Sequence, residues 1–171
     1  MKIAEVTISK TSNKGNGVFA NRNFRKGEIV VCGKRIKRVE KRTLHSFQVE
    51  ENTHVQLDSI ARSINHSCEP NTGIQNNSLG GYNFIALKDI QNGEEITWDY
   101  ETTEYISISI TQCFCGSKFC RKVLRGFKYL PILTIIKYNG FIADYLKKML
   151  FASISQRDIF KKPLFLDIYE V

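Results

Sequence analysis

Three cysteines within eight residues constrain this 171-residue chain more than any other feature. They form the pattern C-x-C-x4-C in the stretch Cys113-Phe-Cys115-Gly-Ser-Lys-Phe-Cys120. Three thiolates at this spacing can converge on one tetrahedral zinc ion, and Gly116 allows the tight turn that such a knuckle needs. A closed structural site needs a fourth ligand, which local spacing does not identify. The candidates are Cys32, His45, His54, His66 and Cys68.

Composition limits the class of protein. Hydrophobic residues make up 42% of the chain and charged residues 25%, which suits one compact globular domain. The longest apolar run, Tyr129 to Ile136, is interrupted by Pro131 and is too short to cross a bilayer. The N-terminus lacks the apolar core of a signal peptide. We therefore expect an intracellular protein, cytoplasmic, nuclear or nucleoid-associated, whose cysteines bind metal rather than form disulfides.

The net charge of +8 favours acidic partners such as nucleic acid or an anionic cofactor, although a solvated basic surface explains it equally well. The densest charge lies in residues 34–42 (KRIKRVEKR). We interpret this stretch as an exposed strand pair or loop, in preference to a nucleic-acid-binding stripe.

Short strands are predicted over most of the chain before Cys113, which indicates a mostly β domain. The expected strands are Ile3–Ile8, residues 18–20, 29–31 and 53–58, Tyr82–Leu87 and Glu95–Tyr100. A short helical turn is expected after Ile60. Helix formers and large apolar residues then follow at roughly helical spacing from Ile132 to Leu150, with Gly140 as a candidate break. We expect residues 131–171 to form a helix and a docking segment, and we favour core packing for them over cofactor coverage or dimerisation.

Two polar segments are ambiguous when each is taken alone. Residues 65–71 (NHSCEPN) could be a polar loop, and residues 93–100 (GEEITWDY) could be a turn leading into a strand. Their order along the chain, after Gly15-x-Gly17 and before the three cysteines, resembles the SET-domain protein lysine methyltransferases that carry a post-SET zinc motif. The resemblance extends from about Lys2 to Leu124.

This resemblance implies a β-clip of small sheets in which the two polar segments thread together as a pseudoknot. It divides the chain into a SET domain (1–108), a post-SET zinc motif (109–126) and a C-terminal helical extension (127–171). It also implies S-adenosylmethionine as methyl donor and one structural zinc ion. The resemblance selects Cys68 as the fourth zinc ligand beside Cys113, Cys115 and Cys120, which leaves Cys32 as a free, buried thiol.

The resemblance assigns cofactor-binding roles to residues from four segments. They are Gly15, Gly17, Asn65, His66, Tyr100, Phe114 and Leu124. The glycines let the backbone approach the cofactor, because no Cβ blocks it. In the family, the asparagine and histidine hydrogen-bond the amino-acid and adenine ends, and the leucine packs on the adenine. Arg62 either pairs with the cofactor carboxylate or is structural.

Tyr100 and Trp98 carry the predicted catalytic roles. Methyl transfer needs a neutral lysine amine aligned in a channel, and a tyrosine hydroxyl can orient that amine. Trp98 matches a position that influences how many methyl groups are added, and its bulk is expected to limit that number.

The sequence departs from the family pattern in three places. The usual channel tyrosine is missing from the stretch Val30-Val31-Cys32-Gly33. The aromatic residues that could replace it are Phe47, Tyr82 and Tyr105. The segment between Gly33 and Asn65 is short, which leaves the substrate poorly specified, and Lys122 stands where the family has glycine.

These features predict an S-adenosylmethionine-dependent lysine N-methyltransferase that acts on a histone or another basic protein. The alternatives are a catalytically weak SET-fold protein that only binds, and a zinc-dependent nucleic-acid-binding protein. We expect a lysine-bearing protein substrate, no membrane association, an indirect contact with nucleic acid at most, and the option of a homodimer.

Overall fold

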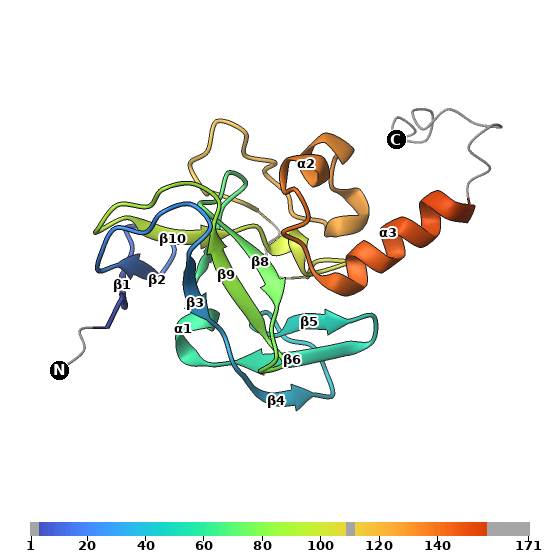
Figure 1. Cartoon of the computed structure of the whole chain (residues 1–171), viewed down its shortest axis with the longest axis horizontal. Helices are drawn as coiled ribbons and strands as arrows, with labels where there is room; N and C mark the ends of the chain where they lie inside the picture. The colour runs from blue at the N-terminus through green and yellow to red at the C-terminus, as the bar shows by residue number, and fades with distance from the viewer. Residues whose placement is uncertain (1–3, 109–111, 157–171) are drawn as a thin grey trace.

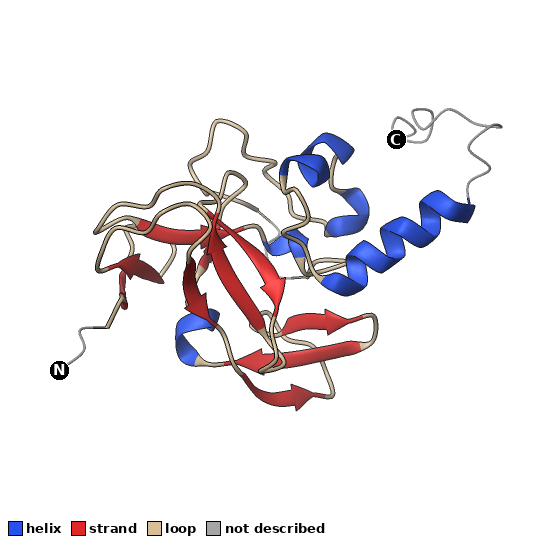
Figure 2. Cartoon of the chain, in the orientation of Figure 1, coloured by secondary structure: helices blue, strands red, loops and turns tan. Residues whose placement is uncertain are grey.

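A computed structural model describes residues 4–108 and 112–156 of the chain. Three small sheets form its body (Figures 1 and 2). In spatial order, the first sheet holds β1 (Val6–Lys10), β2 (Asn16–Ala20), β10 (Glu95–Trp98) and β7 (Asn65–His66). The second holds β3 (Ile29–Cys32), β9 (Tyr82–Ala86) and β8 (Thr72–Asn76). The third holds β4 (Arg35–Val39), β6 (Thr53–Leu57) and β5 (Phe47–Glu50).

Short helices connect and cover these sheets. The described ones are α1 (Ser59–Arg62), the 3-10 turns η1 (Tyr100–Thr102) and η2 (Phe127–Tyr129), α2 (Ile132–Lys137) and α3 (Asp144–Gln156). α1 begins after Asp58, whose carboxylate accepts the backbone N–H groups of Ile60 and Ala61. No helix in residues 4–108 and 112–156 is long and apolar enough to cross a membrane.

The mostly β prediction is confirmed, and the expected strands correspond to β2, β3, β6, β9 and β10. The first expected strand, Ile3–Ile8, is shifted and begins at Val6, while Ile3 lies outside the described residues. Residues 34–42 contain the exposed strand β4, as interpreted from their charge. The sequence did not reveal β5, β7 or β8, because they are short or lie inside polar motifs.

The described part of the C-terminal extension, residues 127–156, forms the two α-helices α2 and α3 rather than one. The break falls where expected, since Gly140 has a φ of +85° and Asn139 a φ of +47°. Tyr138, Ile142, Ala143, Tyr145 and Leu146 are buried in the same core as Val18, Ile74, Phe84 and Ile96 of the sheets. Core packing is therefore confirmed for these five residues, whereas Leu133 and Ile136 of α2 are 76% and 65% exposed. Cofactor coverage and dimerisation stay predictions, and the expected docking segment beyond residue 156 lies outside the described residues.

Candidate functional site

The two polar motifs lie side by side. β7 pairs in parallel with β10, so that Asn65 faces Thr97 and His66 faces Trp98. The Asn71 side-chain amide stabilises this pairing. It accepts a hydrogen bond from the Thr97 N–H at 2.8 Å and donates one to the Glu95 carbonyl at 2.8 Å. Segments about thirty residues apart are therefore threaded together, as the resemblance implied.

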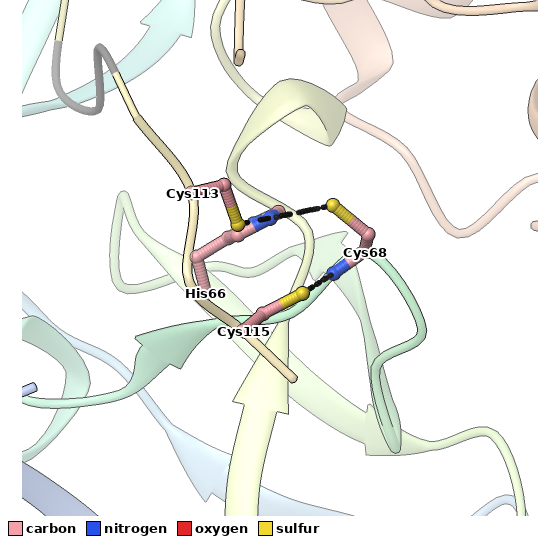
Figure 3. Close-up of side chains that lie close together, drawn as sticks. All are labelled: His66, Cys68, Cys113 and Cys115. Carbon is pink, nitrogen blue, oxygen red and sulfur yellow. Dashed lines mark hydrogen bonds between the residues drawn. The ribbon is translucent and has the colours of Figure 1, made fainter. Parts of the chain in front are cut away.

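A buried cluster of sulfur and nitrogen atoms lies beside this pairing (Figure 3). The ligand atoms of His66, Cys68, Cys113 and Cys115 all lie within 4.8 Å of one another. The Cys120 thiol interacts with the thiols of Cys113 and Cys115 and donates to the Cys113 carbonyl at 3.4 Å. Zn–S bonds of about 2.3 Å in a tetrahedron place sulfurs about 3.8 Å apart. The observed Cys68–Cys113 Sγ separation of 4.0 Å matches this, so the donor set fits one zinc ion.

Burial and local hydrogen bonds shift the pKa values of these thiols in different directions. Burial raises the pKa of Cys68, and it raises the pKa of Cys113 to about 11. Burial also opposes ionisation of Cys115, but hydrogen bonds from the backbone N–H groups of Cys68 and Ser117 outweigh it and lower the pKa of Cys115 to about 7. Cys115 is therefore the thiol most readily ionised near neutral pH, which is the form that binds metal.

His66 is one of the four residues whose donor atoms lie within 4.8 Å of one another, whereas the predicted ligand Cys120 lies outside that group. Because a closed zinc site needs four ligands, His66 and Cys120 are alternatives for the fourth position. Burial lowers the pKa of His66 to about 4, so its imidazole is neutral at pH 7. Its Nδ1 accepts the backbone N–H of Tyr100 at 3.3 Å, which leaves the ring proton on Nε2. That Nε2 lies 3.2 Å from Cys68 Sγ and can donate to it. The geometry therefore suits a hydrogen bond to a metal-bound sulfur.

Asp99 and Arg121 form a second buried centre next to the cysteines. Arg121 donates from one NH2 group to both Asp99 oxygens at 2.7 Å and from Nε to Glu101 at 2.7 Å. Burial acts to lower the pKa of Arg121, but the carboxylates of Asp99 and Glu101 outweigh burial and raise that pKa. The Arg121 backbone N–H faces Cys68 Sγ at 3.4 Å, and the Tyr138 hydroxyl donates to Asp99 at 2.5 Å. The sheets, the knuckle and the C-terminal helices all meet here.

A cavity opens on the other side of Tyr100. Its lining residues are Thr43, Leu44, His45, Ser46, Phe47, Arg62, Trp98, Tyr100, Glu104 and Ile108. Phe47 stacks on Trp98 with ring centroids 5.4 Å apart, and the Trp98 and Tyr100 rings are 4.8 Å apart. Trp98 Nε1 and the Tyr100 hydroxyl both donate to the Ile64 carbonyl, at 3.3 and 3.1 Å. Burial raises the pKa of Tyr100, which keeps its hydroxyl neutral.

Of the three aromatic residues considered as replacements for the channel tyrosine, Phe47 lines the cavity. Tyr82 is fully buried in the core and donates to the Gln48 carbonyl, and Tyr105 is partly buried against the core without lining the cavity. Arg62, whose role the sequence left open, lines the cavity.

Most predicted cofactor residues lie around the threaded motifs. Gly17 is closely packed, since an added Cβ would lie 2.8 Å from Glu95 and 3.0 Å from the Asn65 amide. Asn65 donates to Glu95 at 2.9 Å, and Lys14 pairs with the same carboxylate group at 2.6 Å. Nothing lies within 4 Å of the position that a Cβ on Gly15 would occupy, and the φ of Gly15 is +74°.

Two further predicted cofactor residues come from the knuckle region. Leu124 is buried against Cys68, Cys113 and Tyr100, which joins the knuckle to the cavity wall. Phe114 is 65% exposed and is not packed into this group.

The structure corrects one expectation and explains one departure. Cys32 is exposed rather than buried: it is the last residue of β3, where Val30 and Val31 are both buried and the pairing with β9 shifts register between Ile29 and Val31. Lys122 adopts a φ of +65°, a left-handed conformation that glycine adopts without strain. The backbone therefore keeps a glycine-type turn although the residue is lysine.

Sequence reasoning did not single out Asp99, Glu104, Arg121 or Tyr138 as functional. Asp99 lies inside the segment GEEITWDY, and its charge among buried residues was the available signal. Arg121 directly follows the third cysteine of the knuckle, in a mostly exposed segment that gives no such signal. Tyr138 carries no such signal, because a tyrosine at helical spacing looks like any other core residue.

Comparisons with known proteins agree with this geometry. The family model of the SET domain matches residues 15–101. The variant-silencing SET domain-containing protein of Plasmodium falciparum is 34% identical over 142 residues, and the histone-lysine N-methyltransferase Set2 of Drosophila melanogaster is 30% identical over 139 residues. These alignments cover 69% and 70% of this chain but only 6% of each relative.

The fold is also similar to solved structures. A crystal structure of KRYPTONITE in complex with mCHH DNA, an H3(1-15) peptide and SAH matches with a TM-score of 0.54 and 25% identity, over 70% of this chain and 29% of that one. With the family model covering just over half of the sequence and the threaded motifs in place, the chain belongs to the SET-domain family.

Proposed function

We propose that this chain is an S-adenosylmethionine-dependent protein-lysine N-methyltransferase that acts on a histone or another basic protein. One observation carries the proposal: Tyr100 and Trp98 line a cavity on one side, while Tyr100 also packs on the Leu124 and cysteine cluster on the other. Relatives named histone-lysine N-methyltransferase and a neighbour crystallised with SAH and a histone peptide support it. These names also favour a nuclear location.

The residues around the threaded motifs fit the methyl donor. S-adenosylmethionine supplies a methyl group on a positively charged sulfur. The backbone at Gly15 and Gly17, the Asn65 side chain and the apolar side chain of Leu124 would hold its ends. The open space around Gly15 suits a close approach of the backbone to a ligand, as the glycine allows. Phe114 is exposed and would contact the donor as an outer cover.

The cavity suits a lysine side chain. The faces of Phe47 and Trp98 can pack on its methylene groups and exclude water, and aromatic faces favour a nearby cation. The Tyr100 hydroxyl donates its proton to the Ile64 carbonyl, so its oxygen is left as an acceptor for an amine N–H. Tyr100 thereby orients the lone pair of the amine toward the methyl group. Alignment of the reacting atoms contributes much of the rate of such a transfer.

The zinc ion is proposed to bind Cys68, Cys113, Cys115 and Cys120, with His66 donating to the Cys68 sulfur. The Arg121 backbone N–H points at the same sulfur. This assignment makes zinc structural and places His66 between the metal and the cofactor loop. Chelation should therefore weaken binding of S-adenosylhomocysteine, measured by calorimetry, while the circular-dichroism signal of the sheets persists. An unchanged affinity for S-adenosylhomocysteine after zinc removal would show that the metal does not support the cofactor site.

The central experiment is transfer of a labelled methyl group to histones and to lysate proteins. Tyr100→Phe should reduce transfer strongly, because the orienting oxygen is lost while the ring remains. Tyr129→Phe is the matched control, since Tyr129 is 47% exposed and lies outside the cavity lining. Equal activity in the two variants would contradict the role of Tyr100.

The alternative of a SET-fold protein that only binds has less support now that Phe47 supplies an aromatic wall. Absence of thermal stabilisation by either form of the cofactor would favour that alternative. Dimerisation through the C-terminal extension stays a prediction, which sedimentation would test.

A further inference from the structure

Five basic side chains are exposed along one margin of the third sheet. They are Lys34, Arg35, Lys37, Arg38 and Lys41. β4 pairs with β6 on one side only, so its other edge is open. Figure 1 shows β4 at the periphery of the molecule, with β6 between it and β5.

These charges make no ion pair among the described residues, although the exposed Glu40 lies in the same stretch. Their neighbours across the strand pair are uncharged: Leu57, Gln56 and Val55. The nearby carboxylate of Asp58 is occupied by backbone N–H groups, namely that of Lys34 and those that begin α1.

Two lysines elsewhere on the described surface do have acidic partners. Lys14 pairs with Glu95 at 2.6 Å and Lys147 with Asp144 at 2.8 Å. Unpaired like charges on adjacent residues repel one another, and a bound polyanion relieves that repulsion. An extended strand advances about 3.3 Å per residue, so Lys34 and Lys41 lie at most about 23 Å apart. That length spans several phosphates of a nucleic-acid backbone, whereas one small anion would meet only one or two of these cations.

The side chains indicate which nucleic acid fits. Single strands are held by stacking of their bases on aromatic rings, and residues 34–42 contain no aromatic residue. Lysine and arginine without base-reading neighbours suit the outer phosphates of a duplex. The surface therefore matches duplex backbone, without sequence preference.

The position of β4 gives this surface a role. The chain leaves β4 at Val39 and reaches the cavity wall four residues later, at Thr43. Leu44, His45 and Ser46 continue that wall. In place of the solvated strand and the indirect contact with nucleic acid expected from the sequence, we propose that β4 binds the phosphate backbone of duplex DNA directly and thereby brings lysines of DNA-bound proteins to the cavity. The second half of this statement rests on the proposed function, whereas DNA binding itself does not.

The first experiment measures binding of the full chain to a labelled 20-base-pair duplex of mixed sequence between 50 and 200 mM salt. Wild type should show a log–log salt slope of about −3 to −5, as expected for four or five phosphate contacts. The double variant K37Q/R38Q should lower the slope by about 2 and weaken binding about tenfold or more. The matched control is K10Q/K148Q, which removes the same charge from exposed positions on β1 and α3.

Several outcomes would overturn the inference. Equal loss of binding in the control would show that only net charge matters. Binding to phosphatidylserine vesicles, to single strands or to duplex RNA with greater affinity than to duplex DNA would identify a different ligand. Weak binding with a flat salt dependence in wild type would show that β4 is merely a solvated edge.

A second experiment links the surface to the cavity. Methylation of nucleosomes is compared with methylation of a free histone-tail peptide, and their ratio should fall in K37Q/R38Q but not in K10Q/K148Q. If wild type binds duplex DNA but methylates nothing, the proposed function fails alone. If wild type methylates the peptide but binds no DNA, this inference fails alone.

Discussion

Replacing Tyr138 by phenylalanine tests the junction between the C-terminal helices and the site. The Tyr138 hydroxyl donates to Asp99 at 2.5 Å, and both side chains are buried, with Asp99 only 1% exposed. Phenylalanine keeps the ring volume, so no cavity forms and the lost hydrogen bond dominates the effect. Hydrogen bonds to charged groups contribute about 1.5–3 kcal/mol, whereas neutral ones contribute about 0.5–1.5 kcal/mol. Because Asp99 keeps Arg121, we expect a loss of about 2 kcal/mol in the free energy of unfolding.

Tyr145 supplies the matched control. Its hydroxyl also donates at 2.5 Å from a buried position, but the acceptor is the neutral carbonyl of Thr103. Tyr145→Phe should therefore cost about 1 kcal/mol. Urea unfolding at pH 7 with excess zinc measures both values, provided that the denaturant slope is unchanged. A cost for Tyr138→Phe equal to or below that of Tyr145→Phe would refute the idea that a buried carboxylate depends on the C-terminal helices.

Three further predictions follow from the same structure. Lys122→Gly should be more stable than Lys122→Ala by about 1 kcal/mol in thermal unfolding, because the φ of +65° strains any residue with a Cβ; the reverse order would contradict this. Trp98→Phe should shift products toward more methyl groups in mass spectrometry, and an unchanged distribution would show that Trp98 does not limit them. The pKa of His66 is about 4 in the folded protein and 6.5 in the unfolded chain, so the unfolded chain binds the proton more readily. The free energy of unfolding should therefore fall as the pH drops through this window, by about 2 kcal/mol between pH 7 and 5. Urea unfolding should show this loss in wild type and a smaller one in His66→Asn, and an equal loss in both would assign it to other groups.

The motifs predicted the chemistry of the site better than its geometry. Cys68, Cys113, Cys115 and Cys120 pack in one cluster, but the donor atoms close enough to share one ion are those of His66, Cys68, Cys113 and Cys115. The exposed position of Cys32 was missed, since a single cysteine at a strand end gives no sign of which face it occupies.

Long-range pairing was the hardest part to predict. The local sequence predicts that Trp98 lies on a strand. Its stacking on Phe47, however, depends on a contact between the first and third sheets, which no local pattern encodes. The hydrogen bond from Tyr138 to Asp99 likewise joins residues 39 positions apart. Local periodicity located the elements, whereas burial of charge and shared acceptors arise only when these elements come together.

The Ile64 carbonyl couples the two residues whose roles were predicted separately. It accepts from Trp98 Nε1 and from the Tyr100 hydroxyl at the same time, so the two donors share one oxygen. Phenylalanine at position 98 would leave that oxygen to Tyr100 alone and tighten its hold on the hydroxyl. Substitutions at 98 and 100 should therefore be non-additive in their effect on methyl transfer.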